Sequence, residues 1–241
     1  MSTKPLVMIT GASAGIGQTT ARMFSAAGYA LLLLARRKQL LEDMDLPDTV
    51  CAAANVADRE AVAAAIAQGE AAFGPVDLLV NNAGVSRLSK LEDQDPKEWR
   101  ELLDINVTGV LNCMQLVMPS MKARRHGTII NVSSMAGRKV YPHHDVYGGT
   151  KHFVHAITES ARQSMAPFDV RVMAISPGVT RSEIEKTITN PAALDFWSEG
   201  RDAIGGGISA ESVARTMLFA YEMPQDVILL EMSITATRQA F

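Results

Sequence analysis

Short apolar runs recur along the chain and are separated by longer segments of mixed character. Seven of these runs have strand length: 5–10, 30–35, 50–54, 77–82, 127–133, 170–176 and 227–232. They are apolar almost without interruption, as in "ALLLLA", instead of alternating with polar residues. Such runs are typical of strands that are buried on both faces of a sheet.

The segments between these runs have the length and patterning of helices: 15–27, 37–44, 58–73, 96–122, 146–166 and 210–221. Strand and helix alternation favours right-handed crossover connections and a parallel sheet covered by helices on both faces. No internal repeat, low-complexity tract or linker divides the sequence. We therefore expect an α/β fold, with residues 1–241 forming a single doubly wound domain around a seven-stranded parallel sheet.

One segment, 179–209, breaks this alternation because it is long, mixed in character and ends in three glycines. A connection of this length inside a compact domain is usually functional or mobile. Two interpretations stay open: a surface insertion, or a lid over a substrate with a hinge at Gly205–Gly207. Phe196 and Trp197 would then close over an apolar substrate, or else pack on their own domain.

Composition narrows the function classes. The chain has 241 residues, 47% of them apolar and 20% charged, with a formal net charge of −3. No strongly basic face is implied, which argues against nucleic-acid binding. No apolar run approaches the roughly 20 residues that span a bilayer, and the N-terminal "PLVMIT" is too short for a signal-peptide core. We expect no membrane association and a cytoplasmic location.

The two cysteines, Cys51 and Cys113, form no CxxC pair and lie near no metal-ligand spacing. Isolated cysteines of this kind are typically small buried thiols in a reducing compartment. We expect both side chains to be buried.

A glycine-rich loop, "TGASAGIG" at 10–17, follows the first apolar run and opens a helix. Gly11, Gly15 and Gly17 permit a tight turn and a close backbone approach to a ligand. The free N–H groups and the positive dipole end of the helix favour an anion there. Although the spacing is GxxxGxG and not GxGxxG, the position after the first strand predicts a pyrophosphate site.

The end of the second run indicates which dinucleotide would bind. A carboxylate at this place would bond the ribose hydroxyls and repel a 2′-phosphate. This chain has Ala35 followed by Arg36 and Arg37, and a guanidinium group is well suited to phosphate. With Ser13 as an added hydroxyl donor, the residues favour NADP(H) over NAD(H); the alternative is that the arginines form a solvated basic turn.

An ordered set of motifs runs through the rest of the chain: "TGASAGIG", "NNAG" (81–84), "DINVTG" (104–109), "NVSS" (131–134), "YGGTK" (147–151) and "SPGVT" (176–180). Their order and spacing resemble the short-chain dehydrogenase/reductase family over roughly residues 4–185. The resemblance implies a Rossmann-like fold, a nicotinamide cofactor and the interconversion of alcohols and carbonyls.

The resemblance also implies four catalytic residues. Tyr147 corresponds to the general acid/base, and Lys151 to the group that lowers the pKa of the phenol and holds the nicotinamide ribose. Ser134 corresponds to the group that polarises the substrate oxygen, and Asn106 to the anchor of a water in the proton relay. Ser133 is the alternative serine, but the family spacing favours Ser134, and strand alternation points the two side chains in opposite directions.

Elementary chemistry supports the tyrosine–lysine pair independently. Residues i and i+4 share one face of a helix, so Tyr147 and Lys151 would point the same way. A free phenol has a pKa of about 10, which is too high for a base at neutral pH. A nearby ammonium group would favour the phenolate and lower this pKa, and proton transfer would then become efficient near neutral pH.

The remaining cofactor contacts are assigned by the resemblance alone. "NNAG" would support the adenosine side of the cofactor, and "SPGVT" would orient the nicotinamide carboxamide and begin the lid. Asn55 stands where many relatives have Asp, so we expect an altered contact with adenine, and Asp58 would be a helix N-cap. In full, the expected cofactor-binding residues are Gly11, Ser13, Gly15, Ile16, Gly17, Arg36, Arg37, Asn55, Val56, Asn82, Ala83, Gly84, Tyr147, Lys151, Pro177, Gly178, Val179 and Thr180.

Other polar residues bear on the substrate. His152 and His155 have a possible metal-ligand spacing, but no carboxylate or thiolate cluster accompanies them, so we expect no metal. A histidine at 143 or 144 would line the substrate mouth. Arg138 and Arg181 are candidates to bind a substrate carboxylate, with surface roles as the alternative.

Together these features predict an NADP(H)-dependent oxidoreductase that acts on a small-molecule carbonyl or alcohol. "SPGVTRSEI" and "ILLEMSITATRQ" are similar to the branch of the family that oxidises serine and 3-hydroxy acids, while small ketones are the other candidate substrates. The alternative is a non-catalytic NADP(H)-sensing protein on the same fold. The resemblance also implies a homo-oligomer, a tetramer or dimer, built on 96–122 and 146–166.

Overall fold

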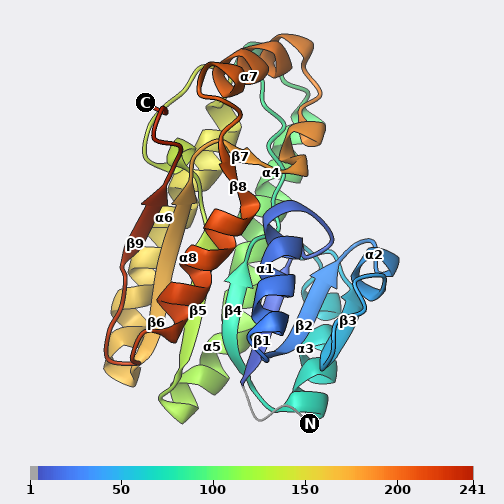
Figure 1. Cartoon of the computed structure of the whole chain (residues 1–241), viewed down its shortest axis with the longest axis vertical. Coiled ribbons are helices and arrows are strands. Elements are labelled where there is room, and N and C mark those ends of the chain that lie inside the picture. The colour runs from blue at the N-terminus through green and yellow to red at the C-terminus, as the bar shows by residue number, and fades with distance from the viewer. Residues whose placement is uncertain (1–4, 241) are drawn as a thin grey trace.

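The chain folds around one seven-stranded parallel sheet with the strand order β3-β2-β1-β4-β5-β6-β9 (Figure 1). The computed structural model describes residues 5–240. Its sheet consists of β1 (Leu6–Thr10), β2 (Ala30–Ala35), β3 (Thr49–Ala53), β4 (Val76–Asn81), β5 (Gly127–Val132), β6 (Val170–Pro177) and β9 (Glu231–Ile234). The order reverses between β1 and β4, which is the switch point of a doubly wound α/β fold.

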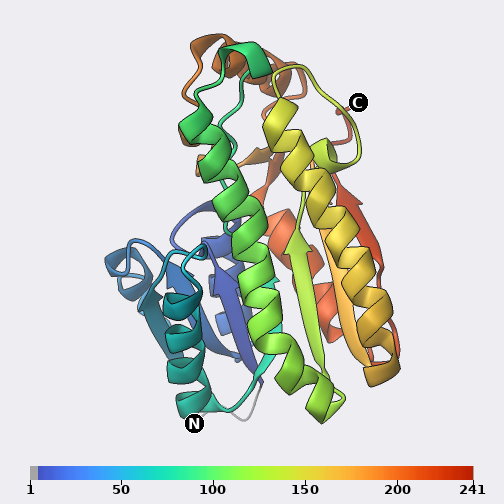
Figure 2. The ribbon, with the colours of Figure 1, turned by 180° about the vertical axis from the view of Figure 1, so that it is seen from behind.

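Helices cover both faces of the sheet. On one face lie α1 (Gly15–Ala26) and α8 (Ala210–Glu222), which pack against each other (Figure 1). The other face is covered by α3 (Arg59–Phe73), α5 (Gly109–Arg124) and α6 (Asp145–Met165), which run in front of the sheet in Figure 2. A short helix, α2 (Gln39–Glu42), follows β2. The fold class and the layers are those that the alternating sequence pattern predicts.

Side chains of each central strand enter two separate cores. In β2, Leu32 and Leu34 join the core under α3, α5 and α6, whereas Leu31 and Leu33 join the core under α1 and α8. Strands β1, β2 and β4 are buried along their whole length. Burial on both faces explains why these strands are continuously apolar in the sequence.

The segment 179–209 is more ordered than a plain connection. Its ends pair as two short strands, β7 (Thr180–Arg181) and β8 (Ile208–Ser209), and between them lies helix α7 (Pro191–Ala203). The Asn190 side chain accepts a hydrogen bond from the Ala193 N–H, and proline occupies the first turn. An Asn N-cap followed by Pro at the helix start is a helix signal that the mixed composition obscured.

Two further element boundaries differ from the sequence expectation. The last strand spans 231–234 instead of 227–232, because Ala174–Pro177 of β6 pair with Glu231–Ile234. The predicted helix 96–122 contains α4 (Pro96–Leu103), a π-helical turn (Asp104–Thr108) and then α5. One extra residue in a helical turn re-aims the side chains that follow, and such turns are frequent at functional sites.

By length and composition alone, the continuous helix Pro96–Arg124 is apolar enough to cross a membrane. Its residues Cys113, Val117 and Met121 lie in the core, and α5 packs against α3 and β4. A buried central helix of a folded domain passes the same test, so this feature does not by itself indicate a membrane span.

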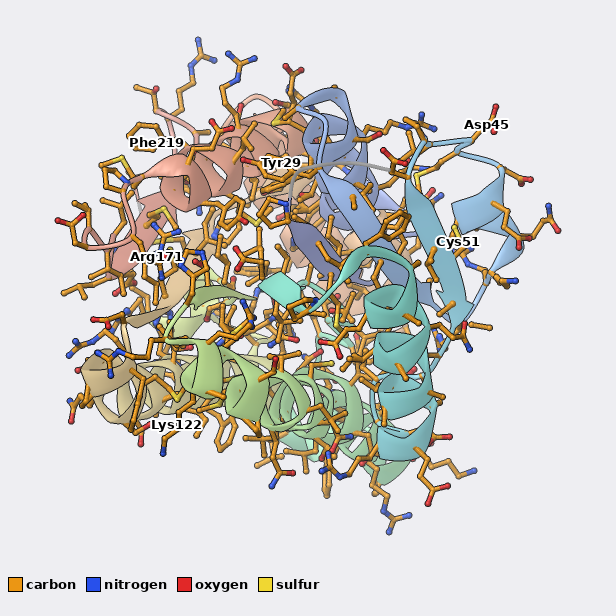
Figure 3. The ribbon with its side chains drawn as sticks, turned by 90° about the horizontal axis from the view of Figure 1, so that it is seen from below. Tyr29, Asp45, Cys51, Lys122, Arg171 and Phe219 are labelled. Carbon is orange, nitrogen blue, oxygen red and sulfur yellow. The ribbon has the colours of Figure 1, made fainter. Side chains whose placement is uncertain are left out.

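The two cysteines differ in burial. Cys113 is fully buried, and burial raises the pKa of its thiol to about 12. Cys51 on the edge strand β3 is only partly buried, which corrects the expectation that both thiols are enclosed. Figure 3 shows Cys51 at this edge of the sheet, next to α2 and far from α8.

A buried arginine fastens the end of α8 to the sheet. Arg171 is 4% exposed and donates to the carbonyl oxygens of Tyr221 and Met223 at 2.8 and 2.9 Å. Its Nε donates to Thr128 Oγ1 of β5 at 3.0 Å, and the side chain lies between α8 and the sheet in Figure 3. Arginine therefore satisfies carbonyls that the end of a helix leaves without partners.

Candidate active site

A cleft of about 1020 Å³ opens at the carboxyl ends of the parallel strands. Its walls come from the loop between β1 and α1, from the residues after β2, β4, β5 and β6, and from the first turns of α6. Helix α7 contributes to the same cleft. Ligands of open α/β sheets bind at this edge, next to the strand-order switch point.

The glycine loop has the backbone that its sequence predicts. Gly11 and Gly15 have φ of 65° and 54°, a region that side chains rarely adopt. A Cβ on Gly11 would lie 2.7 Å from Ala83 Cα, so a larger residue does not fit. Gly15 and Ile16 at the N-terminus of α1 line the cleft, which suits the dinucleotide pyrophosphate.

Gly17 differs from the expectation, because it does not line the cleft. A Cβ there would lie 2.4 Å from both Gly11 O and Asn82 Nδ2. The Asn82 amide donates to Thr10 O at 2.9 Å, so it joins β4 to the end of β1. The third glycine therefore allows α1 to pack closely against these strands.

Basic residues mark the part of the cleft that follows β2. Arg37 Nη2 lies 3.5 Å from Ser13 Oγ, which brings together the two groups that were expected to bind a 2′-phosphate. Arg36 also lines the cleft, and its Nη1 is 4.0 Å from Glu101 Oε1. Asn55 and Val56 line the same region, and Asp58 caps α3 by accepting from the N–H groups of Glu60 and Ala61.

Tyr147 and Lys151 lie on the first turns of α6, and both are almost fully buried, at 8% and 5% exposed. The Lys151 ammonium donates to the Val132 carbonyl at 3.0 Å and lies 5.9 Å from the centroid of the Tyr147 ring. The i, i+4 spacing thus brings both side chains to the cleft at the end of β5, as predicted.

The electrostatics of this pair differ from the expectation. Burial raises the pKa of Tyr147, and a hydrogen bond with Ser134 partly opposes that rise. Burial lowers the pKa of Lys151 to about 8. Burial is the largest influence on the phenol, so its pKa stays above the ordinary value although an ammonium group, bonded to a strand carbonyl, lies in the same site. In this arrangement Tyr147 is a protonated acid at neutral pH.

The two neighbouring serines have distinct roles. Ser134 lines the cleft, and its side chain lowers the pKa of the Tyr147 phenol, against the larger effect of burial. Ser133 Oγ donates to the Lys151 carbonyl at 3.0 Å and thereby joins β5 to α6. This difference agrees with the choice of Ser134 over Ser133 as the residue that faces a substrate.

Asn106 lies in the π-helical turn and is fully buried, behind the cleft wall. Its Nδ2 donates to Val85 O at 2.9 Å and its Oδ1 accepts from Val85 N at 3.0 Å. A contact of 3.2 Å with Thr150 Oγ1 connects it to α6. The Asn106 side chain therefore positions the loop after β4 beside Lys151, and its role as a water anchor stays a prediction.

The residues after β6 are held by the C-terminal segment. Pro177, Gly178, Val179 and Thr180 all line the cleft, and Gly178 N donates to Ile234 O at 2.8 Å. Val179 N donates to Gln239 Oε1 at 3.0 Å, and Gln239 also lines the cleft. Sequence reasoning missed Gln239, since no local pattern indicates that a residue 60 positions away reaches this loop.

Residues of the segment 179–209 line the cleft. Phe196 and Trp197 of α7 line it, and Thr187 holds the segment down by accepting from Ser86 N at 2.9 Å. The residues Gly205–Gly207 have φ of 78°, 88° and 79°. Three successive glycines with positive φ give the backbone the conformational freedom that the hinge hypothesis requires.

Neither arginine proposed for a substrate carboxylate reaches the cleft. Arg138 forms an ion pair with Glu231, and Arg181 donates to Gly207 O at 3.1 Å. Lys139, which sequence reasoning passed over, lines the cleft instead. His144 also lines it, whereas the His143 ring packs 5.2 Å from the Phe196 ring.

Within residues 5–240, no group of three or more His, Cys, Asp or Glu side chains has an arrangement that could hold a metal ion.

The chain belongs to the short-chain dehydrogenase/reductase family, since residues 5–193 match the description "short chain dehydrogenase". It is 34% identical over 244 residues to the sulfoacetaldehyde reductase of Chromohalobacter salexigens, covering 98% of this chain and 95% of that protein. It is therefore an oxidoreductase of this family.

Solved structures agree with this assignment. The closed form of a serine dehydrogenase complexed with NADP+ superposes with a TM-score of 0.91 at 27% identity, covering 98% of this chain and 96% of that one. Serine dehydrogenase from Escherichia coli has a TM-score of 0.85 at 27% identity, covering 98% of this chain and 100% of that one.

The burial of Lys151 predicts a pH dependence. The ammonium form is present below a pKa of about 8 and is lost as the pH rises through that value. We expect kcat/KM for NADPH, which reports ionisations of the free enzyme, to fall above about pH 8. The measurement is NADPH oxidation from pH 6 to pH 10; a flat profile to pH 9.5 would contradict this assignment.

Proposed function

We propose that the protein is an NADP(H)-dependent oxidoreductase that interconverts a small carbonyl compound and its alcohol. The observation that carries this proposal is the convergence of Tyr147, Ser134 and Lys151 at one end of the cleft, with the glycine loop in the same cleft. Tyr147 would supply a proton donor, Ser134 a hydroxyl that polarises the substrate carbonyl, and Lys151 a cation. A non-catalytic sensor would have no need for a tyrosine–serine contact beside its ligand.

The chain supplies position and protons, and the cofactor supplies the hydride. In the reduction, the substrate oxygen lies against the Ser134 hydroxyl, which polarises the carbonyl. As carbon gains the hydride, Tyr147 donates its proton to the developing alkoxide. The buried Lys151 ammonium stabilises the phenolate that this transfer leaves, so the lysine acts most strongly after the proton has moved.

Three groups support NADP(H) over NAD(H). Arg37 and Ser13 lie together, and Arg36 lines the same part of the cleft. No acidic residue directly follows β2, in residues 36–41, where a carboxylate would select the free ribose hydroxyl. The serine dehydrogenase structure described above contains NADP+, which supports the same choice.

The shape and chemistry of the cleft support a small substrate with an acidic group, such as a 3-hydroxy acid, or a small ketone. Tyr141, Phe196 and Trp197 line the cleft with aromatic rings, and Lys139 adds a cation. The related proteins are named for sulfoacetaldehyde and serine, which both carry an acidic group next to a short chain.

Replacing the tyrosine tests the proposed chemistry. Tyr147→Phe removes the proton donor and keeps the ring, so we expect turnover to fall by at least about 100-fold, while NADPH binding stays within about twofold. The measurement is NADPH absorbance decay with small ketones and 3-oxo acids, beside NADPH binding by fluorescence. Tyr29→Phe, on the opposite face of the sheet, is the matched control. Unchanged turnover in Tyr147→Phe would refute the assignment.

A second variant tests the cofactor choice. Arg37→Ala removes a guanidinium from the expected 2′-phosphate site, so we expect the KM for NADPH to rise on the order of tenfold and the KM for NADH to change little. Arg22→Ala, at an exposed position on α1, is the control. An equal rise for both cofactors would show that Arg37 does not recognise the phosphate.

A further inference from the structure

Contacts outside the cleft fix the short turn that follows Ser134. Ser134 precedes the short 3-10 turn Met135–Gly137, and Arg138 follows it. Gly137 packs directly on α6: a Cβ there would lie 2.7 Å from Lys151 O and 2.7 Å from His155 Cδ2. The position of the Ser134 hydroxyl therefore depends on how this turn sits against the helix that carries Tyr147.

A bidentate ion pair fixes the C-terminal end of this turn, at Arg138. Arg138 Nε donates to Glu231 Oε1 at 2.7 Å, and Arg138 Nη2 donates to the other carboxylate oxygen. Glu231 begins β9 and is paired in register with Ala174 of β6. The turn is thereby connected to the edge of the sheet.

Two more side chains continue the network inward. Ser176 Oγ lies 3.1 Å from His155 Nε2 and 3.5 Å from Glu231 Oε1. His155, one helical turn after Lys151, lies 3.9 Å from Glu231 Oε1 through its Nδ1 and packs against Gly137 of the turn that follows Ser134. A serine, a histidine and a glutamate in contact have the composition of a hydrolytic triad, but Ser176 is fully buried and does not line the cleft. Ser176 is therefore not placed to act as a nucleophile on a substrate in the cleft.

We propose that the network of Arg138, Glu231, Ser176 and His155 positions the Ser134 hydroxyl against Tyr147. Arg138 and Glu231 are positioning residues that act through Ser134 and contact neither substrate nor cofactor. This inference rests on the proposed function, because it requires that Ser134 polarises the substrate oxygen.

The network affects the rate more than the stability. The side chains of Arg138 and Glu231 are 49% and 27% exposed, and ion pairs of this kind add little to folding. The paired geometry of guanidinium and carboxylate nevertheless fixes direction as well as distance. Catalysis is sensitive to displacements of about 1 Å, which cost up to about 100-fold in rate.

The first test is Glu231→Gln, which keeps the size of the side chain and removes its charge. We expect kcat to fall about tenfold, with the NADPH dissociation constant within about twofold and the thermal midpoint nearly unchanged. Arg138→Gln tests the same pair from the turn. Glu211→Gln, in the exposed Arg215–Glu211 pair of α8, is the control and should leave kcat unchanged.

The second test repeats Glu231→Gln in a Ser134→Ala background. If Glu231 acts through the Ser134 hydroxyl, its replacement has no further effect once that hydroxyl is gone. The same loss in both backgrounds, an unchanged kcat in the single variants, or failure of both single variants to fold would overturn the inference. Absence of NADPH oxidation by the wild-type protein with every carbonyl would instead refute the proposed function.

Discussion

The site depends on a lysine ammonium that is almost completely buried and bonded to a backbone carbonyl. Lys151 donates to Val132 O, the last residue of β5, and burial brings its pKa down to about 8. The same enclosure raises the pKa of Tyr147. The Tyr147 phenol therefore holds its proton next to the Lys151 ammonium, which would stabilise a phenolate. This arrangement suits the phenol to donate its proton when an alkoxide forms on the substrate.

The fold brings these groups together by aligning the ends of its parallel strands. Val132 ends β5, Asn82 follows β4, Arg36 follows β2, and the loop after β1 opens α1. Close packing maintains this edge: Gly17 lets α1 approach Asn82, and Ser133 joins β5 to α6. The rigid sheet therefore fixes the distances that the chemistry requires, and α7 lines the cleft from the segment after β6.

Much of this could be predicted from the sequence, because the evidence is local. Continuous apolar runs predict the buried strands, the glycine loop predicts the tight turn at Gly11 and Gly15, and the i, i+4 rule predicts the pairing of Tyr147 with Lys151. What could not be predicted depends on contacts between distant residues. The partner of Arg138 is Glu231 and that of Val179 is Gln239, which no local spacing reveals. The raised pKa of Tyr147 likewise depends on burial that only the folded chain defines.

The most direct measurement is a crystal structure of the protein with NADP+. The account predicts the pyrophosphate on the N-terminus of α1, the 2′-phosphate between Arg37 and Ser13, and the Lys151 ammonium within hydrogen-bond distance of the nicotinamide ribose. The Tyr147 hydroxyl should face the reacting carbon of the ring. A dinucleotide bound elsewhere, or a nicotinamide that Tyr147 and Lys151 do not reach, would contradict it.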